Sequence, residues 1–245
     1  MQRRRGASRI LALSLSLCAV ELFAWDDGFM TLTTPSRAES PLMFQLDFQH
    51  RFLQLFPLHG ANALLGVGAV FFDTSRAQAY YQTKEEEFTG ELSVWRAIGG
   101  LRAGVGVEMN AGSGIGAPAG VPAVSWAGTV FASAPLVSEV LTMAANLQYD
   151  TGYSNLNFGV GLGLGIPRLP FSLLLEGSGG FPADEAPVYF WSAGFLVKTA
   201  GHQFILYGGN GNDLRMRTLA GAGFGAKDEL TFGFVIRRKL DVYFD

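Results

Sequence analysis

The stretch from Asn155 to Ile166 alternates, residue by residue, between large apolar side chains and small or polar ones. The apolar set is Leu156, Phe158, Val160, Leu162, Leu164 and Ile166, and the alternate set is Asn157, Gly159, Gly161, Gly163 and Gly165. A period of two places successive side chains on opposite faces of a β-strand. A helix would scatter the glycines around its surface and lose roughly 0.5–1 kcal/mol at each of them relative to alanine. The stretch therefore predicts a strand with one apolar face and one face nearly free of side chains.

The same alternation recurs along the chain. It is clear at residues 44–48, 101–109, 141–149 and 230–244, and weaker at 64–72, 88–96, 124–134, 171–177, 188–198 and 202–208. Stretches rich in Gly, Pro, Ser, Asn and Asp, at 111–120, 179–187 and 208–213, are typical of hairpin connections. Together with 155–166 these segments make eleven candidates. Because single-chain bacterial barrels have even numbers of strands, we expect ten or twelve.

The direction in which the apolar face points separates a soluble barrel from a membrane barrel. A soluble barrel turns bulky apolar residues inward and needs charged residues outside. Here the alternates are too small to coat a surface, and the chain has only four lysines beside 32 glycines and 20 phenylalanines. The longest apolar run, from Val121 to Leu147, is interrupted by Pro122, Pro135 and Glu139, so it predicts no spanning helix. We predict an all-β fold, a single antiparallel transmembrane β-barrel of about 10–12 strands, in contact with the lipid of a bacterial outer membrane.

The N-terminus predicts export. Arg3, Arg4, Arg5 and Arg9 precede a short apolar run that ends at Ala24, which is typical of a cleaved signal peptide. We therefore expect residues 1–24 to be removed and residues 25–245 to form the outer-membrane barrel domain. The alternative is lipidation at Cys18, but Leu17 is bulky where a lipoprotein processing box prefers a small residue. Cleavage after Ala24 would leave no cysteine, which excludes disulfides and thiolate chemistry.

Charge narrows the partners and describes the expected lumen. Without residues 1–24 the chain keeps 14 basic and 20 acidic residues, a formal net charge of −6, with no basic cluster to follow a phosphate backbone, so we expect no nucleic-acid binding. The strand pattern places charges of both signs in the lumen, where they can form ion pairs and close it. They are Asp47, Glu91, Glu108, Asp150, Glu176, Arg51, Arg102, Arg237 and Lys239. Aromatics near segment ends suit interfacial girdles. They are Trp95, Tyr149, Tyr189, Trp191 and Tyr207.

No residue pattern in the sequence indicates catalysis, a cofactor or a metal. His50, His59 and His202 are the candidate imidazole bases, and His202 has Ser192 and Ser178 on neighbouring predicted strands. A histidine beside a glycine-bearing turn is more often a hydrogen-bonding residue of the rim. The acidic run from Lys84 to Glu87 is more typical of a solvated loop than of a cation site. The Gly-x-Gly pairs at 104–106 and 159–165 lack the helix that phosphate binding needs. We assign no catalytic, cofactor-binding or metal-binding residues and expect no enzyme.

Three short motifs resemble an uncharacterised family of bacterial outer-membrane barrels that ends in a GGHxFxL…N…FGFxIxR pattern. They are Gly201-His202-Gln203-Phe204-Ile205-Leu206 with Gly209-Asn210-Gly211, then Phe232-Gly233-Phe234-Val235-Ile236-Arg237-Arg238, and Phe48-Gln49-His50-Arg51-Phe52. The resemblance covers about a quarter of the chain and implies fold and location but no reaction. The last strand also resembles the insertion signal that such barrels present to the barrel assembly machinery, except that Asp245 follows the aromatic Phe244.

Three functions agree with these features. Our main expectation is a structural or assembly-associated barrel with a closed lumen. The first alternative is a narrow pore or transport component, which shares every sequence feature with the main expectation. The second alternative, a lipid-modifying barrel enzyme, is the weakest because it depends on His202.

Overall fold

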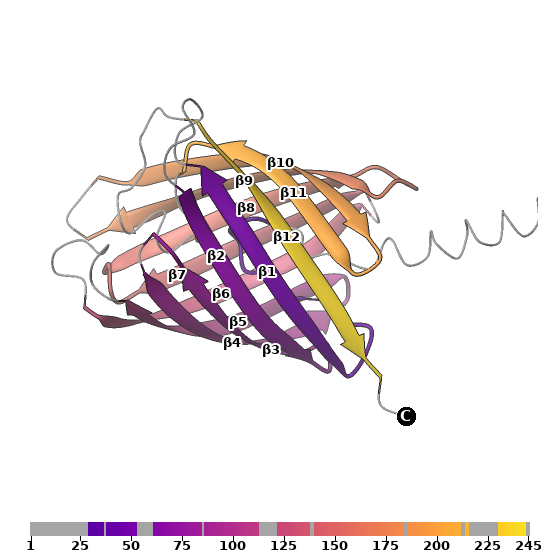
Figure 1. Cartoon of the computed structure of the whole chain (residues 1–245), viewed down its shortest axis with the longest axis horizontal. Coiled ribbons are helices and arrows are strands. Elements are labelled where there is room, and N and C mark those ends of the chain that lie inside the picture. The colour runs from indigo at the N-terminus through magenta and orange to yellow at the C-terminus, as the bar shows by residue number, and fades with distance from the viewer. Residues whose placement is uncertain are drawn as a thin grey trace, which may run out of the picture.

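Twelve antiparallel strands close into a barrel in the computed structural model (Figure 1). Each strand pairs with its neighbours in chain order, and the first pairs with the last, from Leu42 opposite Val242 to Phe52 opposite Phe232. The strands are β1 (Leu42–Phe52), β2 (Ala61–Phe71), β3 (Ser75–Gln82), β4 (Glu87–Ile98), β5 (Leu101–Gly112), β6 (Val124–Val137), β7 (Leu141–Asp150), β8 (Asn155–Gly165), β9 (Phe171–Pro182), β10 (Val188–Thr199), β11 (His202–Gly209) and β12 (Thr231–Val242).

The structure describes residues 29–36, 38–52, 61–84, 86–112, 122–137, 140–183, 186–211, 214–215 and 230–243. The predicted export segment 1–24, His59, Phe244 and Asp245 therefore lie outside the described residues. Within the described ranges, no helix is long and apolar enough to cross a membrane.

The predicted fold class is confirmed, and of the two predicted strand counts the structure has twelve. The strand that the sequence analysis missed is β3. Its outward positions include Ala77 and Ala79, which are too small to give an apolar signal, while Arg76 and Gln78 point inward. Strand β9 also runs to Pro182, so the predicted connection at 179–187 is shorter than expected.

The two ends of the barrel differ in the length of their connections. At one end, which we call the short-turn end, the connections are residues 72–74, 99–100, 138–140, 166–170 and 200–201, and β1 begins and β12 finishes there. The tight turns use left-handed backbone, with φ of 62° at Gly99 and 75° at Gly201, a region that glycine enters at little cost. At the other end, the long-loop end, connections range from residues 83–86 to residues 210–230.

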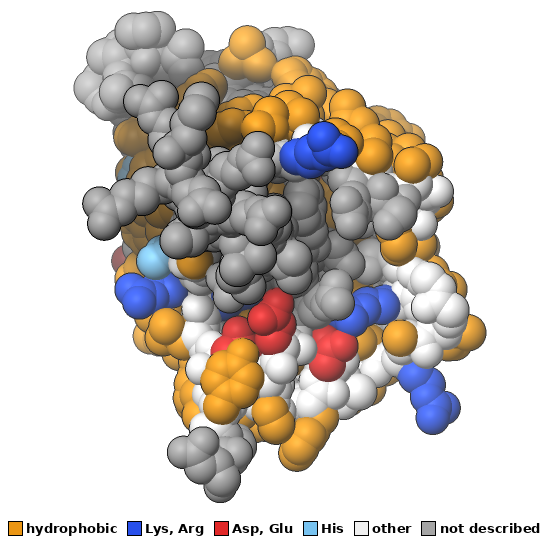
Figure 2. All heavy atoms as spheres, turned by 90° about the vertical axis from the view of Figure 1, so that its right-hand side faces the viewer, with side chains coloured by type: hydrophobic (Ala, Val, Ile, Leu, Met, Phe, Trp, Pro, Cys, Tyr) orange, Lys and Arg blue, Asp and Glu red, His pale blue; other side chains and the backbone are white. Residues whose placement is uncertain are grey.

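The two faces of each strand are assigned as the alternation predicted. On β8, Leu162 is 42% exposed and faces outward, whereas Asn157 is fully buried and faces the lumen. Figure 2, which looks onto the short-turn end, shows hydrophobic side chains around the outside of the barrel and acidic side chains toward its middle. The outer face of the barrel therefore exposes many large apolar side chains, and most polar strand residues are enclosed.

The expected aromatic girdle is correct for three residues and wrong for two. Tyr149, Tyr189 and Trp191 point outward and are at least half exposed. Trp95 and Tyr207 instead face the lumen and are buried. The reason is parity, because Trp95 is in phase with the inward residues of β4 and Tyr207 with those of β11. Trp95 belongs to an internal apolar cluster whose other members are Met43, Val70 and Phe131.

Candidate functional site

The candidate site is the lumen, and its wall is built from inward-facing polar residues. The alternation on each strand buries carboxylates, guanidinium groups, amides and hydroxyls inside the barrel. Of the charges predicted there, all but Arg102 are buried; they are Asp47, Glu91, Glu108, Asp150, Glu176, Arg51, Arg237 and Lys239. Arg102 is half-buried at the short-turn end and pairs with Asp73, with 2.8 Å between Nη2 and Oδ2. The predicted enclosure of both charge signs is confirmed.

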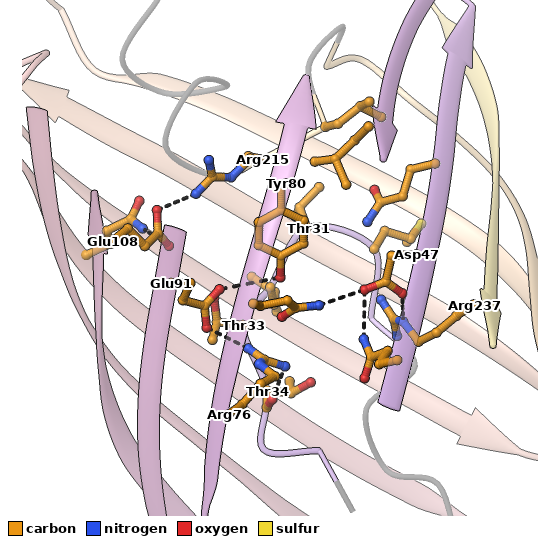
Figure 3. Close-up of a pocket in the computed structure, with 18 residues that line it drawn as sticks. Thr31, Thr33, Thr34, Asp47, Arg76, Tyr80, Glu91, Glu108, Arg215 and Arg237 are labelled. Atoms are coloured by element: carbon orange, nitrogen blue, oxygen red, sulfur yellow. Dashed lines mark hydrogen bonds and ion pairs between the residues drawn. The ribbon is translucent and has the colours of Figure 1, made fainter. Parts of the chain in front are cut away.

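A segment that is not a strand crosses this lumen. Residues Phe29–Ser36, which we call the plug, precede β1 and reach the interior from the short-turn end. Phe29, Met30, Leu32, Thr34 and Ser36 are all buried there. In Figure 3, Thr31, Thr33 and Thr34 lie between the β3–β4 wall and the wall that carries Asp47 and Arg237.

One end of the plug is held by a carboxylate of β9. Glu176 accepts hydrogen bonds from the backbone N–H of Met30, from the backbone N–H of Thr31 at 3.0 Å and from the hydroxyl of Thr31 at 2.7 Å. All hydrogen bonds of this carboxylate that involve described residues come from the plug. A buried carboxylate is costly unless its oxygens are hydrogen-bonded. Glu176 therefore depends on the plug as much as the plug depends on Glu176.

The other end of the plug is held by a guanidinium group of β3. Arg76 Nη1 donates to the carbonyl oxygen of Thr34 at 3.3 Å and to the hydroxyl of Ser36 at 3.2 Å. Its Nη2 pairs with Glu91 Oε1 at 2.7 Å. Because Glu91 orients Arg76 from the neighbouring strand, Arg76 can present its remaining donors to the plug.

The plug also packs against apolar side chains of the lumen. Met30 belongs to a buried cluster with inward-facing residues of β9 to β12; these are Leu174, Leu196, Ile205, Tyr207 and Val235. Phe29 and Leu32 pack with Ala144 of β7. Phe29 lies directly over Gly161 of β8, where an added Cβ would be only 2.6 Å from Phe29 Cδ1. The glycines of β8 therefore provide the space that the plug occupies.

Ion pairs fill the lumen beside the plug. Arg237 Nε of β12 lies 2.6 Å from Asp47 Oδ1 of β1, and Gln45 and Gln78 donate to the other oxygen of Asp47 at 2.7 and 2.8 Å. The hydroxyl of Tyr80 lies within 3.4 Å of Glu91 (Figure 3). With the plug in place, a cavity of about 70 Å³ is left between these groups. That space suits a few water molecules and not a larger solute.

Besides the plug, a loop residue also enters the lumen, from the long-loop end. Arg215, in the connection between β11 and β12, pairs with Glu108 and donates to Thr89. Its Nη1 also lies 3.7 Å from Glu87 Oε1. Arg51 lies at the same end, stacked over the ring of Tyr207 at 4.8 Å from the ring centroid. Residues outside the strands therefore bind the wall of the lumen from both ends of the barrel.

Sequence reasoning missed the plug and three charged residues, Arg76, Glu87 and Arg215. Arg76 was overlooked together with its strand, and Glu87 was assigned to a solvated loop although it is the first inward residue of β4. The inward apolar residues Leu174, Leu196 and Ile205 were the available signal, because apolar side chains in a polar lumen need a covering partner.

The residues considered for catalysis are not brought together. His202 begins β11 at the short-turn end, where its Nδ1 lies 3.3 Å from the Ala200 carbonyl, whereas Ser192 pairs with Gly209 at the far end of the same hairpin. His50 faces outward and stacks on Phe234, with 5.5 Å between ring centroids. The Gly-x-Gly pairs lie within β5 and β8, which continue as strands. No group of three or more His, Cys, Asp or Glu able to hold a metal occurs among the described residues.

A closed barrel with an apolar outside, a polar inside, short turns at one end and longer loops at the other defines a class. The chain is a transmembrane β-barrel of the bacterial outer membrane. In this class the short turns lie on the periplasmic side, so the plug enters the lumen from the periplasm. The three motif segments lie on the adjacent strands β11, β12 and β1, with Gly201, Asn210 and Gly211 in the connections that flank β11.

Solved outer-membrane porins share this fold. The KdgM porin has a TM-score of 0.57 and 8% sequence identity, over 79% of this chain and 98% of the porin. The NanC porin has a TM-score of 0.58 and 9% identity, over 80% of this chain and all of the porin. At these identities the similarity is one of fold. No protein-family model matches the chain, and no curated protein matches it in sequence.

Proposed function

We propose that this outer-membrane barrel is a narrow pore for small polar solutes and that the plug closes it. The observation that carries the proposal is the plug, because a separate segment, together with inward side chains of the wall, occupies the lumen. This reading replaces our main sequence expectation of a structural body and adopts its first alternative.

The shape of the wall favours a pore over a structural body. Barrels of about eight strands are filled by their own side chains, and wider ones enclose cavities or channels. Here the wall beside the plug carries Gly161 and Gly163, whose missing side chains leave room in the lumen. A purely structural barrel would be more stable if larger residues filled that space directly. The similarity in fold to two solved porins also favours a pore.

The charges of the wall suggest which solutes would pass. Asp47, Glu91 and Glu108 lie on β1, β4 and β5, and Arg237 and Arg76 lie on β12 and β3. Both signs therefore line the same passage, and neither cations nor anions meet a wall of one sign. We expect weak charge selectivity and passage of small hydrophilic solutes. The proposal assigns no catalytic activity to the chain.

Planar-bilayer conductance tests the pore. The informative variant carries Phe29→Ser, Met30→Ser and Leu32→Ser together, and we call it the plug-loosened barrel. It removes the apolar seating of the plug and changes no strand residue. We expect low or intermittent conductance from the unaltered chain and steady conductance from the plug-loosened barrel. Thr33→Ser, a change in the plug that keeps its buried apolar residues, is the matched control and should conduct like the unaltered chain.

The proposal is wrong if the plug-loosened barrel is folded and yet passes no current. Folding is checked by migration in SDS before and after boiling. We propose that β12 is recognised by the barrel assembly machinery during insertion and that outer-membrane lipid covers the apolar outside.

A further inference from the structure

We propose that the lumen contains a binding site for a short peptide, and that Phe29–Ser36 is its exchangeable resident. This inference rests on the proposed pore function in one respect, because exchange of the resident would open and close the pore. The binding itself does not depend on conductance and is measured separately. The site consists of Glu176, Arg76, the glycines of β8 and the apolar cluster of β9 to β12.

The site recognises the backbone of its ligand as well as its side chains. The carboxylate of Glu176 accepts from two consecutive backbone N–H groups, those of Met30 and Thr31. At the far end, Arg76 donates to the backbone carbonyl of Thr34. Because every peptide residue except proline carries both an N–H and a C=O group, these anchors hold a peptide backbone but do not set its direction, which depends on the order of the side-chain seats. A peptide of reversed sequence would place its side chains in the wrong order between the same anchors.

The side-chain seats define the class of peptide that fits. An aromatic ring lies over Gly161, where no Cβ obstructs it, and Phe29 provides this ring. A long flexible apolar residue, Met30, enters the cluster formed with Leu174, Leu196 and Ile205. The next position has a hydroxyl that donates to Glu176. The ligand is therefore a peptide with an aromatic residue, an apolar residue, a hydroxyl residue and a second apolar residue in succession, followed by a tail made mostly of hydroxyl residues.

The resident can leave because it is not part of the barrel wall. The registers of β7 to β12 are complete without it, and the plug adds no strand to the sheet. Its backbone is held by the side chains of Glu176 and Arg76, and water can replace those contacts in an open lumen. Arg76 keeps its partner Glu91 when the plug leaves, whereas Glu176 loses every donor that the plug supplies. When the plug leaves, the Glu176 carboxylate therefore needs new hydrogen-bond donors.

The test uses a fluorescently labelled peptide with the sequence of residues 29–36 and the full-length plug-loosened barrel in detergent. We expect saturable binding by fluorescence anisotropy, and weaker binding to the unaltered chain, whose site is already occupied. Adding Glu176→Gln to the plug-loosened barrel should weaken binding roughly 10- to 100-fold, since charge-assisted hydrogen bonds are lost. The reversed peptide and Gly177→Ala, which lies beside Glu176 but faces lipid, are the controls.

The possible results separate this inference from the pore proposal. Saturable binding that depends on Glu176 supports the site, even if no conductance is ever recorded. Conductance of the plug-loosened barrel without saturable binding, or binding that the reversed peptide matches, overturns the site and leaves the pore standing. If both proposals hold, the peptide will also block the current of the plug-loosened barrel.

Discussion

Gly161→Ala adds a single methyl group to the wall directly beneath the plug. The new Cβ would lie 2.6 Å from Phe29 Cδ1 and 2.9 Å from Leu32 Cδ1. Both distances are shorter than carbon atoms tolerate, so one of the two elements must move. The atoms in the way belong to the plug, which is held by side chains alone, whereas β8 is held by its ladders to β7 and β9. We therefore expect the plug to move and the wall to stay.

The expected magnitude follows from a comparison with Gly163→Ala, two residues along the same inward face. At that position the nearest atoms, Leu174 Cδ2 and Phe29 Cζ, would lie 3.6 and 3.9 Å from the added Cβ, which is ordinary contact. Overpacking at Gly161 costs about 1–3 kcal/mol. If the plug yields, that cost shifts its seating equilibrium roughly 5- to 150-fold toward release. Gly163→Ala should leave the plug seated and stabilise the barrel by about 0.4–1 kcal/mol through lower backbone entropy of the unfolded chain.

Cysteine labelling measures the release. Thr34→Cys replaces a buried plug residue with one of similar size, and the background carries Cys18→Ser because Cys18 is the one cysteine of the sequence. A water-soluble maleimide then labels position 34 only when the plug leaves its seat. We expect faster labelling with Gly161→Ala than with Gly163→Ala, and no loss in the free energy of unfolding of the barrel in either variant.

Two results would refute this reasoning. Equal labelling rates in the two alanine variants would show that Phe29 does not rest on Gly161. A loss of about 1–3 kcal/mol in barrel stability for Gly161→Ala, with no change in labelling, would show that the wall yields and that the plug is an integral part of the fold.

Further predictions concern the faces, the lumen and the ends of the chain. Leu162→Arg, on the lipid face, should reduce the free energy of unfolding by about 2–4 kcal/mol in bilayers, and Asn157→Asp, on the lumen face, by well under that amount; the reverse order in urea titrations would invert the faces. Arg237→Met should cost about 3–5 kcal/mol because it leaves Asp47 buried without its cation, and Asp47→Asn in the same chain should recover part of the loss in the same titration. Unheated samples should migrate faster in SDS than boiled ones, with β-type circular dichroism, and a helical spectrum would contradict the barrel. N-terminal sequencing of the membrane form should begin at Trp25, and an intact leader would contradict cleavage.

Most of the wall could be predicted from the sequence because the alternation within each strand indicates which side chains face lipid and which face the lumen. The alternation around Leu162 places one side in lipid and the other in the lumen without reference to any other strand. The same parity, applied to Trp95 and Tyr207, would have placed both inside, and the error arose from giving aromatic type priority over phase. The sequence analysis missed β3 because Ala77 and Ala79 can face lipid but are too small to produce an apolar alternation.

The sequence by itself determined the class of fold, the lipid face, the enclosure of both charge signs and the residues of the wall that carry them. These properties depend on residue type and a period of two, which are local. Only the tertiary structure decided which charges meet, such as Arg237 with Asp47, and that Phe29–Ser36 lies across the lumen against Glu176. Those contacts join residues far apart in the chain, and they depend on how twelve strands close and stagger, which no local pattern encodes.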